Sequence, residues 1–274
     1  MYNEQRRNFE LPRVKSINTS GHKFGLVYAG IGWIIWRDES LLPKHLVFEL
    51  HYLGGTEESY TLNFSRPGAQ VIAQYYNLIH LGFKGYQQIM ENCLANARLL
   101  SKSLEATGWY TCVSDIHRKK GEYGFKGISE AEFHKEDETS ADYNPGLPVV
   151  AFRLSDEFKK EFPHIKQESV SNLLRAKQYI IPNYPLPPDE EKTEILRIVV
   201  RESMSFDLLD RLIADICAVT TRLMEASPSD LGCVQGEHDT TAEKQISSKG
   251  KQAEEGQGKG GERPMTDGIH RAVC

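Results

Sequence analysis

The sequence predicts an α/β fold followed by a smaller α+β domain. The chain has 274 residues, enough for one large domain or two modest ones, and 39% are hydrophobic, which permits a sizeable core. Short segments of β-branched and aromatic residues alternate loosely with segments in which apolar residues recur every three or four positions. We expect the edge of a large domain over residues 1–93 and a small domain over residues 94–226.

The first part of the chain predicts strands joined by turns. A short strand is expected at residues 14–18, followed by a turn at residues 19–21. Residues 32–36, Gly-Trp-Ile-Ile-Trp, are mostly β-branched and aromatic, which predicts a buried strand. A further short strand is expected at residues 46–50, before a loop that runs from Gly54 and ends at Pro67 and Gly68.

A long helical pattern follows this loop. It predicts one helix from about residue 69 to 81 and a second from about residue 86 to 107, separated by Gly82 and Gly85. In the second helix, apolar residues recur at the spacing of an amphipathic helix. These residues are Ile89, Cys93, Ala97, Leu100 and Leu104.

The second half mixes regular and polar segments. Residues 117–144 are charged and rich in Gly, Glu and Lys, which predicts an exposed insertion or mobile loop. Residues 227–274 are dominated by Ser, Gly, Glu, Lys and Gln, and we expect a disordered tail. Strands are expected at 149–154, at 179–181 before Pro182, and at 195–200, and helices at 169–176 and 206–226.

The composition limits the classes of function that we expect. The net charge of −5 gives no basic excess, so we do not expect nucleic acid as a partner. The five cysteines form no CxxC pair and no zinc-finger spacing, which predicts no metal site and favours free thiols in a reducing compartment. The first residues contain no apolar run, and the apolar stretch at 25–36 is too short for a membrane span. We therefore expect a cytoplasmic protein.

The strongest chemical signal is the segment Ser-Gly-His-Lys-Phe-Gly at residues 20–25, between two expected strands. Its glycines allow a tight turn. A lysine in a pocket loses its proton more easily than a surface lysine, and a neutral amine can attack a carbonyl cofactor. So short a motif has a high false-positive rate, and the alternative is an ordinary surface lysine beside a loop histidine.

Longer blocks strengthen this signal. Residues 11–26 closely resemble the cofactor-lysine segment of the glutamate decarboxylases, which are group II pyridoxal-phosphate-dependent decarboxylases. The resemblance extends from residue 11 to about 226 and corresponds to the carboxyl-terminal half of that family's chain. It continues through residues 32–38, 52–55 and 63–76, and weakens but persists at 146–152 and 196–201.

The resemblance implies a fold and a reaction. Residues 1–93 would be the carboxyl-terminal part of a fold type I large domain that binds pyridoxal 5′-phosphate, and residues 94–226 the small carboxyl-terminal domain. The implied activity is that of an L-glutamate 1-decarboxylase, a carboxy-lyase that forms γ-aminobutyrate and CO2. A decarboxylase of the same cofactor class that acts on another amino acid is a weaker alternative, because the quoted blocks look specific to the glutamate branch.

The resemblance also implies site residues. Lys23 matches the lysine that forms an aldimine with pyridoxal phosphate, and His22 matches the histidine that lies against the cofactor. Phe64 and Ser65 match a pair that reaches the cofactor phosphate of a partner subunit. Arg197 matches an arginine that holds a substrate carboxylate. The alternatives are a structural ion pair for Arg197 and a helix cap for Ser65, and the cap is compatible with phosphate binding.

The sequence also departs from the family. The family's phosphate ligands, and the aspartate that pairs with the cofactor ring nitrogen, precede the matched region. We therefore expect a truncated chain or fragment of a decarboxylase. The alternatives are a short relative without catalysis and a half-subunit that binds or modulates a full-length decarboxylase. The family implies a homodimer or higher homo-oligomer, and calmodulin binding is not expected because the tail lacks tryptophan.

Overall fold

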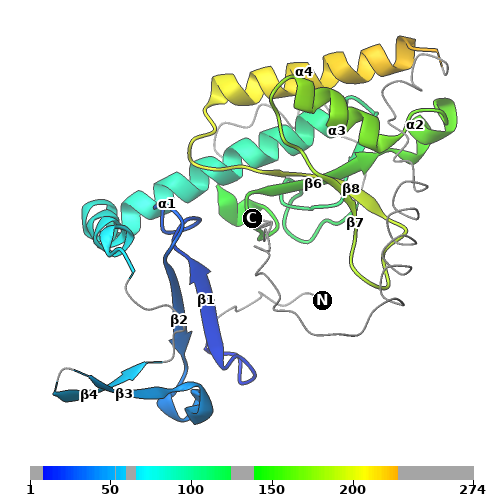
Figure 1. Ribbon diagram of the computed structural model, residues 1–274. Helices are drawn as coiled ribbons and strands as arrows, with labels where there is room; N and C mark the ends of the chain where they lie inside the picture. The colour runs from blue at the N-terminus through cyan, green and yellow to red at the C-terminus, as the bar shows by residue number, and fades with distance from the viewer. Residues whose placement is uncertain (1–8, 53, 60–65, 125–138, 228–274) are drawn as a thin grey trace, which may run out of the picture. The chain divides into compact units, whose positions relative to one another are not determined.

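The computed structural model describes residues 9–52, 54–59, 66–124 and 139–227, and Figure 1 shows their helices and strands. The chain divides into two compact units. The first contains Met1–Arg153 and Arg197–Ile213, and the second contains Leu154–Leu196 and Ala214–Cys274. The expected domain boundary between residues 93 and 94 falls within a helix and stays a prediction.

Two antiparallel hairpins begin the first unit. Strand β1 (Ser16–Ser20) pairs with β2 (Gly32–Trp36), and β3 (Phe48–Tyr52) pairs with β4 (Gly55–Ser59). The expected strands at 14–18 and 46–50 are thus present with a shift of two residues. Two short 3-10 helices, η1 (Glu39–Leu41) and η2 (Lys44–Leu46), connect the hairpins.

Strand β2 has the predicted bounds, but the prediction that it is buried is wrong. Trp33 is 46% exposed and Ile35 is 49% exposed. β-Branched and aromatic residues favour the extended backbone, but burial also requires a layer of protein over each face of the strand. The β1–β2 ribbon has two strands and leaves this apolar surface accessible.

Helix α1 (Ala69–Ala106) follows, and the predicted break at Gly82 is confirmed. Gly82 has φ 57° and ψ −168°, a conformation that side chains disfavour and glycine adopts without steric cost. The residues after the break carry the buried apolar face, which includes Ala97 and Leu100, both fully buried. Before the break, large apolar side chains such as Ile72 and Ile79 are about 70% exposed.

A four-stranded sheet has the order β5-β6-β8-β7. Its strands are β5 (Tyr110–Cys112), β6 (Val149–Leu154), β7 (Asn183–Pro185) and β8 (Glu194–Val199). The carboxyl-terminal half of α1 packs against β5. The rings of Tyr110 and Phe152 pack edge to face in the core of the first unit, with their centroids 5.3 Å apart, and both residues are fully buried.

The strand expected at residues 179–181 is absent, and β7 begins only at Asn183. Helix α3 (Gln167–Ala176) is followed by Gln178 at φ 72°, and the Tyr179 N–H donates to the Leu174 carbonyl at 3.0 Å. This helix-ending turn uses the backbone that the expected strand needed. Pro182 then has no N–H to offer a neighbouring strand.

The ends of the polar segment at 117–144 also differ from expectation. His117, Arg118, Tyr143 and Asn144 are all at most 7% exposed. Between them lie residues 125–138, outside the described residues, and the 3-10 helix η4 (Ser140–Asp142). The prediction of an exposed segment is wrong at both ends, because their polar side chains have buried hydrogen-bond partners that composition does not reveal.

The second unit contains two further helices besides its part of the sheet. Ser155 caps α2 (Asp156–Glu161) by accepting from the Phe158 N–H at 3.1 Å. Gln167 accepts from the Leu154 N–H at 2.9 Å and donates to Asn183 at 2.7 Å. The core of this unit is formed by Phe158, Ile165, Val170, Leu174, Ile195, Leu196, Ile216, Val219 and Leu223.

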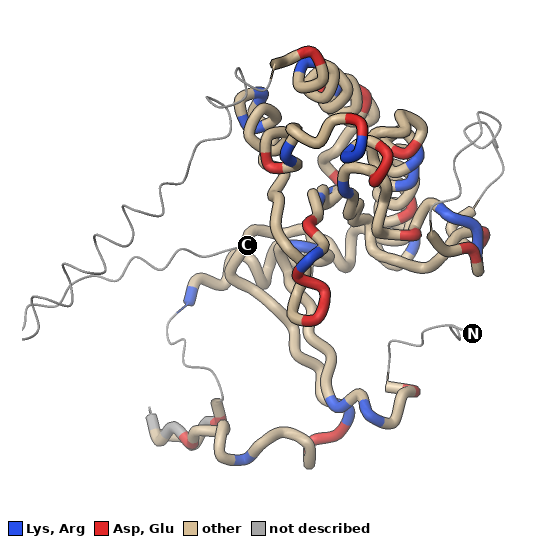
Figure 2. Tube along the Cα trace, turned by 90° about the vertical axis from the view of Figure 1, so that its right-hand side faces the viewer, with Lys and Arg blue, Asp and Glu red and all other residues tan. Residues whose placement is uncertain are grey.

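The last helix, α4 (Phe206–Glu225), matches the helix expected at 206–226. All but the first residue of the expected disordered tail lies outside the described residues. None of the helices in the described ranges combines the length and apolar composition needed to cross a bilayer. Figure 2 shows basic and acidic residues interspersed along the described chain.

Substituting Phe152→Ala should lower the free energy of unfolding by about 3–5 kcal/mol, because it opens a cavity beside Tyr110. Urea denaturation at neutral pH measures this change. Phe83→Ala is the matched control, since Phe83 is 82% exposed, and should change stability by at most about 0.5 kcal/mol. Equal effects of the two substitutions would contradict the assignment of Phe152 to the core.

Candidate functional site

Lys23 lies in residues 21–31, between β1 and β2, which we call the lysine loop. The Lys23 N–H donates to the Ser20 carbonyl at 3.3 Å, and the Leu26 N–H donates to the Lys23 carbonyl at 3.2 Å. The Val27 N–H closes the turn on the Gly21 carbonyl at 3.2 Å. Lys23 is exposed and His22 is half-buried. The described residues around Lys23 therefore hold it on a built turn and not in an enclosed pocket.

Two buried glycines make this turn possible. A Cβ at Gly21 would lie 2.9 Å from the Ile31 carbonyl oxygen, and one at Gly25 would lie 2.6 Å from the Gly21 carbonyl oxygen. Both distances are shorter than real side chains allow, and backbone atoms cannot move aside cheaply. A side chain at either glycine would therefore reshape the turn that carries Lys23.

Helix α1 supports the lysine loop through side chains at three positions along its length. Asn77 donates to the Leu26 carbonyl at 3.0 Å, and Gln70 donates to the Ala29 carbonyl at 3.2 Å. The Tyr86 hydroxyl donates to the Gly25 carbonyl at 3.3 Å, and its ring stacks on Phe24 at 5.2 Å. Sequence reasoning missed these supporting residues, because a polar helix residue has no local signal that names its partner.

The other expected site residues lie elsewhere. Arg197 is on β8, exposed between the buried Leu196 and Ile198. The structure thus brings His22 and Lys23 together and places Arg197 on a different sheet. Phe64 and Ser65 lie outside the described residues.

A hollow of about 620 Å³ lies beside the β1–β2 ribbon. Ser20, whose carbonyl accepts from the Lys23 N–H, is on its wall, but Lys23 and His22 do not line it. Its lining consists of Asn18, Thr19, Ser20, Gly32, Trp33, Ile34, Glu58 and Ser59. The hollow is therefore a neighbour of the lysine loop, formed by both hairpins.

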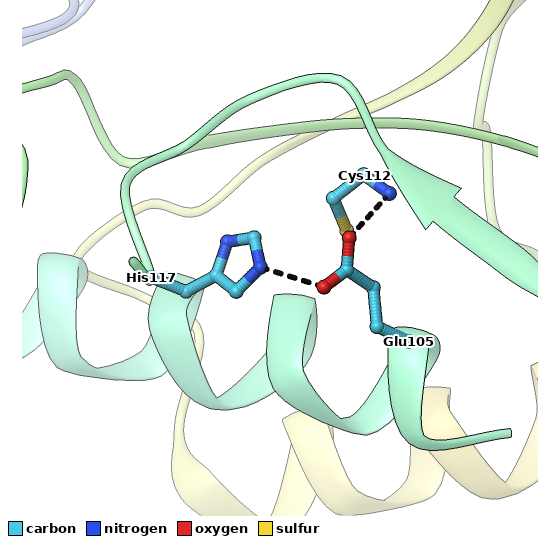
Figure 3. A group of neighbouring side chains, drawn as sticks. All are labelled: Glu105, Cys112 and His117. Carbon is cyan, nitrogen blue, oxygen red and sulfur yellow. Dashed lines mark hydrogen bonds and ion pairs between the residues drawn. The ribbon is translucent and has the colours of Figure 1, made fainter. Parts of the chain in front are cut away.

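A buried polar cluster lies at the end of α1, and it was not predicted from the sequence. One Glu105 carboxylate oxygen accepts from Arg118 at 2.7 Å and from the Cys112 N–H at 2.9 Å. The other lies 3.0 Å from His117 Nε2 (Figure 3). Arg118 also contacts Asp115 at 2.7 Å. No spacing rule links these residues, because the segment that supplies His117 and Arg118 has the composition of an exposed loop.

Opposing effects set the charge of Glu105. Burial favours its neutral form, but the hydrogen bond and charge of His117, the Cys112 N–H and the charge of Arg118 together lower its pKa below the usual value of a glutamate. Glu105 is therefore ionised at neutral pH. Its side chain has no solvent exposure, so these partners replace the water that the carboxylate lost.

The same cluster brings Glu105, Cys112 and His117 within reach of one metal ion, with ligand atoms no more than 4.8 Å apart. Both Glu105 oxygens are already engaged, one of them by the Arg118 guanidinium, whose charge opposes a metal cation. Burial raises the pKa of the Cys112 thiol, which keeps it protonated against the Ser101 carbonyl. The arrangement favours a structural ion-pair network.

Comparisons with known proteins show which proteins the chain is similar to. Residues 3–123 match the pyridoxal-dependent decarboxylase conserved domain. This match agrees with the family resemblance of the sequence. The described part of the chain also matches the solved glutamate decarboxylase of Lactobacillus brevis CGMCC 1306, with a TM-score of 0.64 and 34% identity over 82% of this chain and 44% of that one. The sphingosine-1-phosphate lyase of Burkholderia pseudomallei K96243 shares the fold, with a TM-score of 0.55 and 18% identity. This match covers 89% of this chain and 43% of that one.

Two of the relatives in sequence are glutamate decarboxylases. The Saccharomyces cerevisiae enzyme is 44% identical over 82% of this chain and 39% of its own length. Glutamate decarboxylase 2 of Arabidopsis thaliana is 40% identical over 86% of this chain and 41% of its own length. The chain therefore spans about two fifths of the length of these relatives. The α/β fold class is confirmed, and a separate small carboxyl-terminal domain stays a prediction.

Glu105→Gln should lower the free energy of unfolding at pH 7 by about 3–5 kcal/mol, because it leaves Arg118 and His117 without their shared anion. A lowered carboxyl pKa stabilises the fold above the unfolded value of about 4.3 and loses this effect as pH falls through the folded value. Urea denaturation at pH 7 and pH 3 should therefore show a smaller deficit at pH 3.

Glu202→Gln is the control for this experiment. Glu202 is exposed and lies 3.5 Å from Arg201, and such surface pairs contribute at most about 1 kcal/mol. A Glu105→Gln deficit that matches this control, or one that does not vary with pH, would contradict the buried ion-pair network.

Proposed function

We propose that this chain supplies part of a pyridoxal-phosphate-dependent L-glutamate 1-decarboxylase, with Lys23 as the residue that attaches the cofactor. The lysine loop is the observation that carries the proposal. Two glycines and three side chains of α1 fix its backbone, and Lys23 projects from it with an exposed side chain. The sequence identity of 44% to a glutamate decarboxylase supports the assignment.

The residues of the loop fit the cofactor. An exposed primary amine is the group that bonds covalently to a carbonyl carbon, and the half-buried ring of His22 is next to it. When bound, pyridoxal phosphate supplies a ring that accepts the electron pair left when a carboxylate departs as CO2. Phe64 and Ser65 would contact the cofactor phosphate of a partner subunit.

Arg197 would hold a carboxylate of the substrate. A guanidinium presents planar paired donors that match a carboxylate, and Arg197 lies on the exposed face of β8. L-Glutamate has two carboxylates, so one can leave while the other is held. The products would be γ-aminobutyrate and CO2. A cytoplasmic location and a homodimer or higher homo-oligomer stay predictions.

Incubation of the chain with pyridoxal phosphate, followed by borohydride reduction, should label Lys23, because its amine is exposed on the fixed turn. Mass spectrometry of peptides locates the label. Lys23→Arg should remove it and leave the background at Lys15 and Lys44 unchanged. Label spread evenly over the lysines would contradict the assignment of Lys23.

A second function has its own observation, and we propose it as the alternative. Ile72, Tyr75, Tyr76 and Ile79 recur at helical spacing on α1 before Gly82 and are 61–71% exposed. Contiguous apolar surface of this kind marks binding sites for protein partners. The partner of this alternative is a full-length decarboxylase subunit, to which the chain binds as a non-catalytic half-subunit.

Ile79→Glu should weaken such a complex by at least about tenfold, because it buries a charge in an apolar contact. Size-exclusion chromatography with light scattering can measure binding to the Saccharomyces cerevisiae glutamate decarboxylase. Ile180→Glu is the control, since Ile180 is 77% exposed in the second unit. No complex with the unsubstituted chain, or equal weakening by both substitutions, would contradict this alternative.

A further inference from the structure

One residue of α1 has an unusual position beneath the lysine loop. Gln74 is only 4% exposed, although the large apolar residues before and after it on the helix are exposed. Its carboxamide oxygen accepts from the Trp33 indole N–H at 2.7 Å. The same oxygen lies 3.2 Å from where a Gly21 side chain would begin, and its carboxamide nitrogen occupies the space beside Gly25.

This arrangement links three parts of the chain through one carboxamide. Gln74 belongs to α1, Trp33 belongs to β2, and Gly21 and Gly25 belong to the turn that carries Lys23. The two glycines leave the volume that the carboxamide fills. The turn and the side chain are therefore complementary in shape, and the indole holds the carboxamide oxygen in one orientation.

We propose that Gln74 is a positioning residue for Lys23. It fixes the backbone of residues 21–25 against α1 and so sets the direction from which the Lys23 amine reaches a carbonyl. The proposal rests on the proposed function for its chemical meaning, since it is the cofactor that this amine would meet. Gln74 acts through the backbone of the turn and does not itself touch the reacting atoms.

The effect of Gln74 should be local. Its recorded partners are the lysine loop and β2, whereas the core of the first unit is built from residues such as Leu100, Tyr110 and Phe152. Loss of the carboxamide should therefore loosen the loop and leave that core in place. This separates a positioning role from a general contribution to folding.

The test compares Gln74→Leu with Gln74→Glu. Leucine has a similar volume but offers the indole no acceptor, whereas glutamate keeps an oxygen for it. Gln87→Leu is the matched control, because Gln87 is an exposed glutamine on the same helix. Urea denaturation verifies that each variant retains the fold.

The first readout needs no cofactor. Hydrogen exchange measured by NMR reports the Trp33 indole N–H and the Val27 amide, which closes the turn on Gly21. Gln74→Leu should speed the exchange of both by at least about fivefold, the effect of losing one net hydrogen bond. Gln74→Glu and Gln87→Leu should stay within about twofold of the unsubstituted chain.

The second readout is the rate at which pyridoxal phosphate and borohydride label Lys23, relative to the exposed Lys44. Gln74→Leu should lower this ratio by at least about fivefold. Gln74→Glu should keep the labelling ratio of the unsubstituted chain, and Gln87→Leu should leave this ratio unchanged. Labelling of Lys23 at the normal rate in Gln74→Leu, or unchanged hydrogen exchange in that variant, would overturn the positioning role.

The two readouts also separate this proposal from the proposed function. If the unsubstituted chain does not label Lys23, the proposed function fails. Hydrogen exchange then still decides whether Gln74 fixes the turn. Faster exchange in Gln74→Leu supports the positioning of the turn, and unchanged exchange overturns it.

Discussion

The contact between helix α1 and the lysine loop determines the geometry on which the candidate site depends. The β1–β2 ribbon has little buried apolar surface of its own, and Trp33 and Ile35 are both about half exposed. A two-stranded ribbon is marginally stable in isolation. Hydrogen bonds made by Gln70, Gln74 and Asn77 of α1 hold the ribbon and its loop in place, so the position of Lys23 depends on a helix that begins 46 residues further along the chain.

Gly82 divides α1 into parts with different roles. The part after it lies in the core of the first unit and ends in the Glu105 network, whose buried ion pairs tie the helix to residues 112–118. The part before it presents polar side chains to the lysine loop and apolar side chains to solvent. The break can redirect the helix without loss of its anchor, because glycine adopts this backbone conformation without strain.

Local pattern predicted much of the fold, and its failures share a cause. The strands at 32–36 and 149–154 have their predicted bounds, because β-branched content is a local property. The exposure of β2, the burial of His117 and the absence of a strand at 179–181 depend on distant parts of the chain or on how a helix ends. The site follows the same rule: the segment around Lys23 is recognisable from its residues, whereas Gln74 and Glu105 are defined by contacts that no spacing reveals.

The two proposed functions meet on the same stretch of helix. One face of the first part of α1 carries Gln70, Gln74 and Asn77 beneath the lysine loop, and another carries the exposed Ile72 and Ile79. A partner that covers the apolar face would order the helix and thereby reduce the entropy cost of fixing the loop. Cofactor attachment would in turn favour the partner by the same free energy, since such coupling is reciprocal. One chain could therefore use the two faces of this helix for cofactor attachment and for partner binding, whereas the non-catalytic alternative uses the apolar face alone.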